Sequence, residues 1–337
     1  MASSTRIGVI LAQIGTPSAP EARSVRPYLR RFLSDRRIVD THPLLWQPVL
    51  RGIILRTRPR RSARLYQQIW SEEGSPLWVY SRRQQSALQE RLGSKYQVEL
   101  GLAYSEHSIE RAMEALEQAG ISRILVVPMF PQYSSTTTAS VYDQTCFAAL
   151  GRQGFWGTAT KRFVPTLRFV EPYYAEPGYI LAMKAHLQRM MKGQNTDPDY
   201  FLLSFHGIPK RYAATGDPYP EQCLETGRLL AKAMGWESGR WQTSFQSRFG
   251  PEEWVGPSTE ESIKRFPAMG ISSPMIFSPG LVTDCLETLH ELNIEGREHF
   301  QASGGKAERY QFAPCLNDQP EWLEFLAELV KRNAGGW

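Results

Sequence analysis

Several features that define common protein classes are missing from this chain of 337 residues. It has only four cysteines, at positions 146, 223, 285 and 315, and no CxxC pair. This excludes a zinc knuckle and a disulfide-rich scaffold, and it is typical of a protein from a reducing cytosol. The sequence also lacks a P-loop, a GxGxxG after its first apolar run, HExxH and GxSxG. The usual signatures of nucleotide binding, zinc proteolysis and serine hydrolysis are therefore absent.

No apolar run is long enough to cross a membrane. The first, Ile7–Ile14, has eight residues, which is too short for a signal peptide or a membrane span. The segment Leu44–Leu55 is interrupted by Gln47, Pro48 and Arg51. Two interpretations of this segment stay open, a helix packed on a core and a helix lying on a membrane surface. We expect a cytoplasmic protein, with peripheral membrane association as the second possibility.

Acidic residues and lysines are nearly missing from an early stretch of the chain. Residues 22–64 contain twelve Arg, two Asp and neither Lys nor Glu, whereas the whole chain has a net charge of +5. Guanidinium groups in such a stretch suit phosphate, anionic lipid or carboxylate ligands. No helix-turn-helix, RNA-recognition or zinc-finger pattern accompanies them, so we expect no nucleic-acid partner. A solvated basic surface accounts for most of these arginines under any hypothesis.

Apolar runs that suit buried strands alternate with helical patterns along the chain. Most of these runs are continuous, as expected for strands covered on both faces; they are Ile7–Ile14, Val98–Tyr104, Ile124–Phe130, Tyr200–Phe205, Thr243–Gln246 and Pro274–Ser278. Apolar residues at helical spacing lie between them, for example within residues 25–33 and 109–119. The order predicts an α/β fold with two similar, doubly wound, Rossmann-like lobes and parallel sheets.

The length suggests two domains of roughly 150 residues each. We place an amino-terminal lobe at residues 1–165 and a carboxy-terminal lobe, with the catalytic residues, at 166–318. Residues 319–337 are expected to form a helix that packs back on the lobes. Ligands of open α/β sheets bind at the carboxyl ends of the strands. Residues that directly follow a strand are therefore the first candidates for a functional site.

His206 is such a residue, because it follows the run Tyr200–Phe205 and precedes Gly207. A neutral imidazole at this position can accept a proton or bind a metal near neutral pH. The structural alternative is a histidine whose ring is hydrogen-bonded to nearby backbone. The residue alone does not decide between the two.

A row of glutamates follows the last predicted strand. Glu287, Glu291 and Glu295 recur at i, i+4 and i+8. On a regular α-helix such a row drifts by roughly 40° per step, and a π-type widening would bring the three into line. Stacked carboxylates repel one another, so a track of oxygen ligands for a divalent cation would explain them. A solvated helix face is the alternative.

Taken together, these motifs resemble those of the ferrochelatases, which insert ferrous iron into a porphyrin to make haem. Six blocks, in the family's order, carry the resemblance: IGTPSAPEARSVRPYLRRFLSDRRIVD (14–40), YQQIWSEEGSPLWVYSRRQ (66–84), PMFPQYSSTTTASVYD (128–143), LLSFHGIPKRY (202–212), SFQSRFGPEEW (244–254) and SPGLVTDCLETLHEL (278–292). Together they extend over most of the chain and are far more specific than any single block.

The resemblance implies insertion of Fe²⁺ into protoporphyrin IX, with release of two protons, in a cleft between the lobes. The family's essential histidine and glutamate fall on His206 and Glu287, and its acidic row, which would bind the metal with them, continues onto Glu291 and Glu295. Its porphyrin contacts fall on Ile14, Arg36, Arg58, Arg61, Tyr66 and Ser75. Alternative functions are a coproporphyrin III ferrochelatase, a chelatase of another tetrapyrrole, and a haem or metal carrier without catalysis.

The sequence departs from the family pattern at three places, one of which is Phe130 in the position of a frequent tyrosine. Many members have Met-Arg-Tyr-Gly where this chain has Leu102-Ala103-Tyr104-Ser105, so Ala103 replaces an arginine that lines the family's site. Members with a [2Fe–2S] cluster place several cysteines near the carboxyl end, where this chain has only Cys315. We therefore expect no iron–sulfur cluster and no required cofactor, because Fe²⁺ is a substrate.

Overall fold

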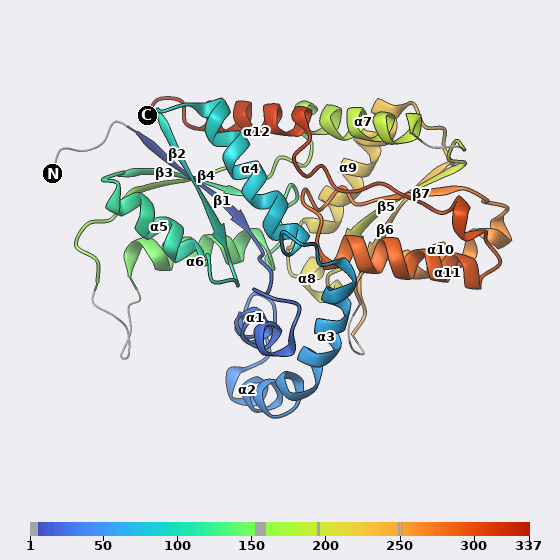
Figure 1. The fold of residues 1–337 in the computed structure, drawn as a ribbon, viewed down its shortest axis with the longest axis horizontal. Coiled ribbons are helices and arrows are strands. Elements are labelled where there is room, and N and C mark those ends of the chain that lie inside the picture. The colour runs from blue at the N-terminus through green and yellow to red at the C-terminus, as the bar shows by residue number, and fades with distance from the viewer. Residues whose placement is uncertain (1–5, 152–159, 194–195, 249, 251) are drawn as a thin grey trace. The chain divides into compact units, whose positions relative to one another are not determined.

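A computed structural model describes residues 6–151, 160–193, 196–248, 250 and 252–337. The chain forms two compact units, each with a four-stranded parallel sheet and helices around it (Figure 1). The first unit comprises residues 1–130, 135–171 and 326–337, and the second comprises residues 131–134 and 172–325. The predicted α/β class, with two lobes built on parallel sheets, is confirmed.

The sheet of the first unit has the strand order β2-β1-β3-β4. Its strands are β1 (Ile7–Gln13), β2 (Tyr96–Leu102), β3 (Arg123–Pro128) and β4 (Thr166–Phe169). Every side chain of β1 is buried, which explains why this strand is a continuous apolar run. The helices of this part of the unit are α4 (Pro76–Leu92), α5 (Ile109–Gln118) and α6 (Thr138–Leu150), with α4 and α5 packed on β2.

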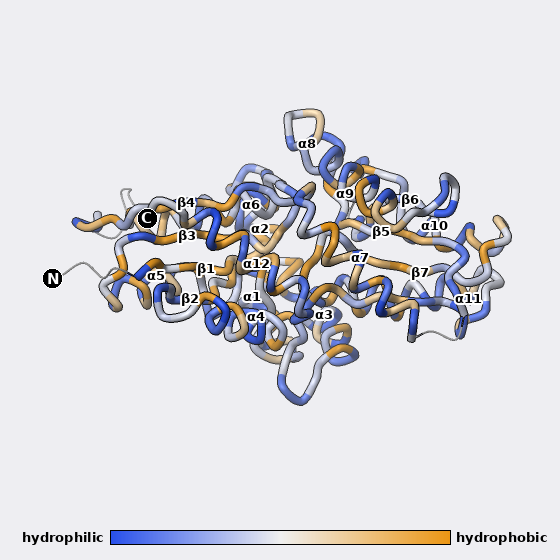
Figure 2. The backbone as a smooth tube through the Cα atoms, turned by 90° about the horizontal axis from the view of Figure 1, so that it is seen from above, coloured by the Kyte–Doolittle hydropathy of each residue, from blue (hydrophilic) through white to orange (hydrophobic). Residues whose placement is uncertain are grey.

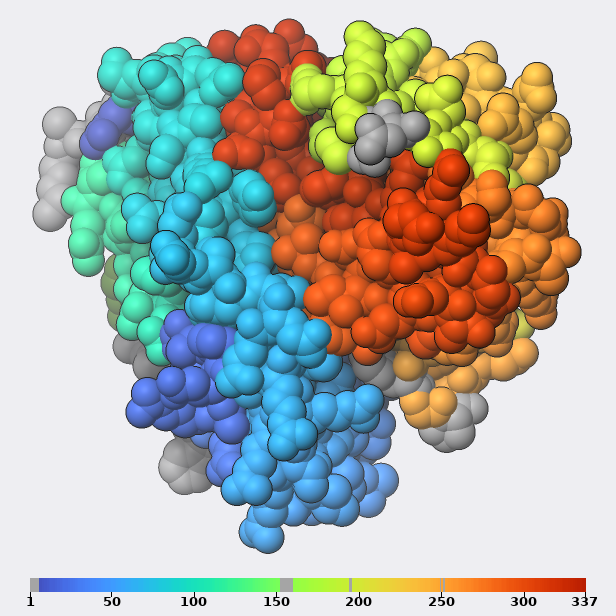
Figure 3. Space-filling view, turned by 45° about the vertical axis from the view of Figure 1, so that its right-hand side comes forward, coloured from blue at the N-terminus to red at the C-terminus, as the bar shows by residue number. Residues whose placement is uncertain are grey.

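Most of the arginine-rich stretch forms a group of helices between β1 and α4. The helices are α1 (Ala22–Ser34), α2 (Pro43–Val49), the π-helix η1 (Leu50–Ile54) and α3 (Leu55–Ile69). α1 packs against α3, and α3 continues directly from η1. In the space-filling view these blue segments form one continuous exposed surface (Figure 3). The basic stretch is therefore a helical surface of the first unit.

The sheet of the second unit has the order β6-β5-β7-β8. Its strands are β5 (Tyr200–His206), β6 (Trp241–Gln246), β7 (Pro274–Phe277) and β8 (Gln311–Phe312). The segments β5 and β7 are hydrophobic for most of their length (Figure 2). The helical elements are α7 (Pro177–Lys192), α8 (Lys210–Ala214), α9 (Tyr219–Met234), α10 (Thr259–Arg265), η2 (Pro267–Met269), the π-helix η3 (Glu287–Glu295), α11 (Gly296–Ala302) and η4 (Ala307–Arg309). The last helix, α12 (Pro320–Asn333), begins in the second unit and ends in the first.

All six predicted strands are present, with ends that differ by at most two residues. β4 and β8 were not predicted; they have four and two residues and lie at the sheet edges. Among the described residues, no helix combines the length and the apolar character that a membrane span requires.

Candidate functional site

The end of β5 positions His206. Its partner in the parallel register of β5 and β6 is Gln246, so the two strands end side by side. The imidazole Nδ1 lies 2.7 Å from the carbonyl oxygen of Gly207. A carbonyl only accepts hydrogen bonds, so this contact places a proton on Nδ1 and leaves the lone pair of Nε2 available. The half-buried ring therefore presents a proton acceptor beyond the strand end.

Gly207 makes this tight turn possible. Its N–H donates to the carbonyl of Gln246 at 2.8 Å. A Cβ at position 207 would lie 2.8 Å from that carbonyl oxygen and 3.1 Å from the ring of Trp254. Only glycine lets the chain after His206 pass this close to the end of β6.

Buried hydroxyl groups beneath His206 fix the end of the sheet. Ser204 donates to the Gln246 side-chain oxygen at 2.6 Å, and it also contacts Thr259 Oγ1 at 2.7 Å. With its oxygen held, the Gln246 amide points its Nε2 at the carbonyl of Glu287, 3.5 Å away. The end of β6 is thereby connected to the first residue of η3.

The glutamate row lies on η3, which is a π-helix over its whole length. The π-type widening that was considered for the glutamate spacing is thus present in the structure. Two features accompany it. The Tyr310 hydroxyl donates to the carbonyl of Leu292 at 2.5 Å, and a Cβ at position 296 would lie only 2.2 Å from that hydroxyl. Gly296, the residue after η3, therefore lets Tyr310 reach a carbonyl of the widened helix, a contact that the sequence analysis did not identify.

The buried carboxylate of Asp284 fixes the chain just before η3. It accepts from Thr288 Oγ1 at 2.9 Å, from the Cys315 N–H at 3.1 Å and from Asn317 Nδ2 at 2.7 Å. Asn317 Oδ1 accepts in return from the Asp284 N–H at 2.9 Å. Because both of its oxygens accept hydrogen bonds from the chain, Asp284 anchors the helix, and we assign it no chemistry.

Glu291 is held by Ser247, the residue directly after β6. The Ser247 N–H donates to one carboxylate oxygen at 2.7 Å, and the Ser247 hydroxyl donates to the other. Ser247 has a φ of 63°, which is unusual for a residue with a side chain. Ser247 lies inside the block SFQSRFGPEEW, and its position directly after a strand was the only signal that could have identified it.

The charges at the strand ends act on Glu291. Burial raises the pKa of this carboxyl group, and the negative charge of Glu287 raises it further. The two Ser247 hydrogen bonds and the positive charge of His206 lower the pKa, but burial prevails. The structure thus brings His206, Glu287 and Glu291 into one electrostatically connected group.

The third glutamate lies near a buried histidine. Glu295 is half-buried, and its carboxylate is 3.6 Å from Nδ1 of His290. In the part of the chain that the structure describes, no three His, Cys, Asp or Glu side chains are grouped so that they could hold a metal ion. Within those described residues, His206 and the three glutamates therefore do not form one compact set of metal ligands.

The six expected porphyrin contacts all lie in the first unit. Ile14 follows β1 and packs on its hydrophobic core. The Ser75 hydroxyl, which is buried, accepts from Thr16 Oγ1 at 2.7 Å, and buried Tyr66 packs edge to face on Trp70. The three arginines lie on the helical surface and its loop, with Arg58 half-buried and Arg36 and Arg61 exposed.

A cavity of about 270 Å³ lies in the first unit, and Ser75 is the only one of the six residues that lines it. Ala103, in place of the frequent arginine, packs against the hydrophobic core of the same unit.

All four cysteines are free thiols, and burial raises the pKa of Cys223, Cys285 and Cys315 well above the ordinary value. The absence of an iron–sulfur cluster stays a prediction.

A solved structure identifies the class of fold. SirB from Bacillus subtilis with Fe³⁺ superimposes with a TM-score of 0.56 over 98% of this chain and 96% of that chain, at 11% sequence identity. At this identity the similarity concerns the fold alone, an α/β architecture of two lobes with parallel sheets.

Sequence relatives define the family. The ferrochelatase family model matches residues 6–334. Ferrochelatase 1 of Shewanella oneidensis is 44% identical over 99% of this chain and 98% of that protein. The ferrochelatases of Alcanivorax borkumensis, at 42% identity, and Hamiltonella defensa, at 43%, match 98% and 97% of this chain and 95% and 98% of their own lengths.

The chain therefore belongs to the ferrochelatase family. It is a metal chelatase, a lyase of haem biosynthesis whose substrates are a porphyrin and ferrous iron. The resemblance noted in the sequence is confirmed at this level.

Proposed function

We propose that the chain inserts Fe²⁺ into protoporphyrin IX and releases the two pyrrole protons, with His206 as the proton acceptor. The observation that carries this proposal is the group formed by His206, Glu287 and Glu291 at the ends of β5 and β6. It combines a nitrogen base with carboxylates, which are the groups that removal of a proton and delivery of a hydrated cation require.

His206 accepts a pyrrole proton through Nε2. Its Nδ1 contact with the Gly207 carbonyl fixes the tautomer and the plane of the ring, so the free lone pair has a defined direction. The positive charge that forms on the ring is stabilised by Glu291, whose electrostatic interaction with His206 is favourable. The proton is therefore taken up where a negative charge is already in place.

The carboxylates have two tasks, to bind iron and to carry protons away. Glu287, whose carbonyl lies 3.5 Å from Gln246 Nε2, begins the row, and Glu291 and Glu295 continue it along η3. Because burial raises the pKa of Glu291, this group exchanges protons nearer to neutral pH than an exposed glutamate does. Iron is a substrate that must leave, so exchangeable oxygen and nitrogen ligands suit it better than a closed thiolate site.

The porphyrin contacts rest on the resemblance. It assigns Ile14, Tyr66 and Ser75 to the macrocycle and its edge, and the arginines to its carboxylates, for which guanidinium groups are well suited. Strain on the bound macrocycle would expose the nitrogen lone pairs, and binding of the rest of the large apolar ring would supply the energy.

We also propose a cytoplasmic location with peripheral membrane contact through α2 and η1. Leu44, Leu45 and Ile53 are 79%, 69% and 62% exposed, and two exposed arginines lie near them, Arg51 on η1 and Arg56 at the start of α3. Exposed leucines beside arginines are typical of helices that lie on anionic lipid. Co-sedimentation with vesicles of anionic lipid and of neutral lipid tests this contact. The proposal is contradicted if the wild-type protein and the double variant Leu44→Ser/Leu45→Ser are recovered equally and neither binds to the vesicles.

Coproporphyrin III is the alternative substrate, since it differs from protoporphyrin IX in having more carboxylates. The block LLSFHGIPKRY, which resembles that of bacterial members using protoporphyrin, favours protoporphyrin IX. The test is turnover of both porphyrins side by side with anaerobic Fe²⁺, with His206→Ala as the control. Turnover that does not exceed the spontaneous rate on either porphyrin would instead indicate a carrier.

A further inference from the structure

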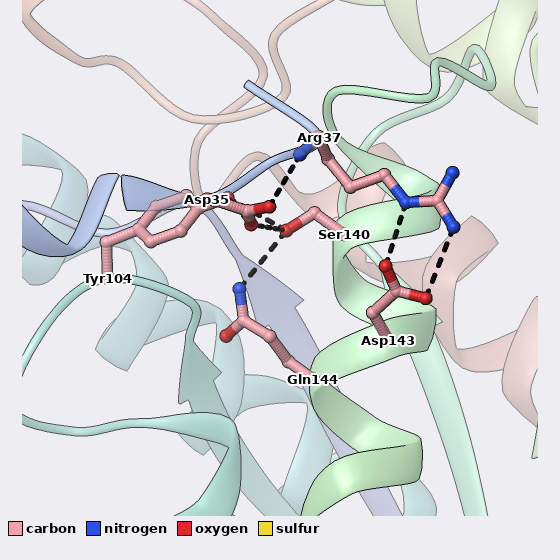
Figure 4. A network of polar contacts seen from close by, with 6 residues as sticks. All are labelled: Asp35, Arg37, Tyr104, Ser140, Asp143 and Gln144. Atoms are coloured by element: carbon pink, nitrogen blue, oxygen red, sulfur yellow. Dashed lines mark hydrogen bonds and ion pairs between the residues drawn. The ribbon is translucent and has the colours of Figure 1, made fainter. Parts of the chain in front are cut away.

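A cluster of polar side chains in the first unit surrounds Asp35, the residue that ends α1 (Figure 4). One oxygen of its carboxylate accepts from the Tyr104 hydroxyl at 2.7 Å and from the Ser140 hydroxyl at 2.6 Å. The other oxygen accepts from the Arg37 N–H at 2.8 Å. The Asp35 carbonyl also accepts from the N–H groups of residues 38 and 39. Asp35 thus holds the loop 35–39 in two ways, through the hydrogen bonds of its side chain and through those of its backbone carbonyl.

The two arginines of this loop have different environments. The Arg37 guanidinium donates twice to Asp143 on α6, at 2.8 and 3.3 Å, and Figure 4 shows it directed at that helix. The exposed Arg36 has no hydrogen-bond or ion-pair partner among the residues that the structure describes. Arg37 is therefore used to attach the loop, whereas the Arg36 charge is available to a ligand.

The Asp35 carboxylate is satisfied without Arg36. Two hydroxyl groups and one amide take up its oxygens, so it does not neutralise the neighbouring guanidinium. Burial, and then the negative charge of Asp35, raise the pKa of Tyr104, so that its hydroxyl remains a donor throughout the working pH range. A loop that is fixed before the ligand arrives loses less conformational entropy on binding.

We propose that Asp35, with Tyr104 and Ser140, is a positioning residue that holds the loop 35–39 so that Arg36 binds a porphyrin carboxylate. The inference rests on the proposed function, because it takes the anion that Arg36 binds to be a carboxylate of the porphyrin. It separates the adjacent arginines into one ligand-binding residue, Arg36, and one structural residue, Arg37. This distinction is not visible in the sequence DRR.

The test compares two porphyrins, protoporphyrin IX and its dimethyl ester, which lacks the carboxylate charges. Asp35→Asn and Tyr104→Phe are expected to raise KM for the free acid about tenfold, with kcat changed less than about twofold, as for the loss of one well-placed charged contact. KM for the ester should stay at the wild-type value. In an Arg36→Gln background, Asp35→Asn should cause no further rise, because both changes remove the same contact.

Three results would overturn the proposal: an equal loss on acid and ester, which indicates general structural damage; an unchanged KM for the free acid in both variants; and additive effects in the double variant. Tyr104→Phe keeps the buried ring, so the comparison survives if Asp35→Asn does not fold. Porphyrin binding is also measured by fluorescence without metal. Binding without turnover in the wild type contradicts the proposed function and leaves the test of Asp35 intact.

Discussion

Replacing Ser247 with alanine is expected to raise the pKa of Glu291 by about one unit. The change removes the hydroxyl that donates to one carboxylate oxygen and keeps the N–H that donates to the other at 2.7 Å. A hydrogen bond to a charged group contributes about 1.5–3 kcal/mol, and one pKa unit corresponds to about 1.4 kcal/mol. We take the lower end, because the remaining N–H and the His206 charge continue to stabilise the carboxylate.

The shift can be measured through the pH dependence of stability. Because the pKa of Glu291 lies above its ordinary value of 4.5, the folded protein binds this proton more tightly than the unfolded chain does. The contribution of Glu291 to the free energy of unfolding is therefore largest below pH 4.5 and falls until the pH passes the raised pKa. The pH range over which this contribution falls is the pH window of Glu291. In Ser247→Ala, the upper end of the window should move up by about one pH unit, and the total decrease in the free energy of unfolding across it should grow by about 1.4 kcal/mol.

Denaturant unfolding at closely spaced pH values measures this window. Glu291→Gln, which has no proton to titrate, isolates the contribution of Glu291 when its curve is subtracted. Ser247→Gly is the matched variant, because it loses the same hydroxyl but accepts the φ of 63° without strain. It should show the same pH window as Ser247→Ala and a stability higher by roughly 1 kcal/mol at every pH. If Ser247→Ala keeps the wild-type window, Ser247 does not control the carboxylate and the reasoning fails.

Three further changes test the site. His206→Ala should abolish insertion of iron or zinc while porphyrin fluorescence still reports binding, and near-normal turnover would remove His206 as the base. Glu287→Gln should lower kcat about 100-fold or more, as expected for loss of a proton-transfer group; wild-type kcat would exclude it from the reaction. Gly296→Ala places a Cβ 2.2 Å from the Tyr310 hydroxyl and should lower the free energy of unfolding by about 1–3 kcal/mol. Tyr310→Phe in the same chain should recover part of that loss, and no recovery would refute the steric explanation.

The central strands could be predicted because burial on both faces makes them continuous apolar runs. β1 is buried along its whole length, and its predicted and observed ends differ by one residue. β4, with the sequence TLRF, has no fully buried residue, and β8 has only two residues. Edge strands of this kind are formed by pairing with a neighbour, and their own sequences do not reveal it.

The candidate site could be predicted where one local pattern was sufficient. His206 was placed at a strand end from the apolar run before it, and the widening of η3 from the spacing of three glutamates. Ser247 was missed, because a serine with positive φ resembles any other serine in a sequence. The contacts of Asp35 with Tyr104 and Ser140 join residues 69 and 105 positions apart. Only the tertiary fold brings such pairs together.

The hydrogen bonds of Ser247 also bear on how tightly iron is held. Each oxygen of Glu291 already accepts one donor, and a carboxylate oxygen retains one more lone pair. Glu291 can therefore still contact a cation, but the Ser247 donors compete for its charge. A carboxylate that accepts hydrogen bonds and has a raised pKa is a weaker metal ligand than a free one. The donors share its charge, and the proton competes with the metal for the same oxygens. Since an enzyme that delivers iron must release it, we expect Ser247→Ala to bind divalent metal more tightly than the wild type above the pKa of Glu291, and more weakly below it.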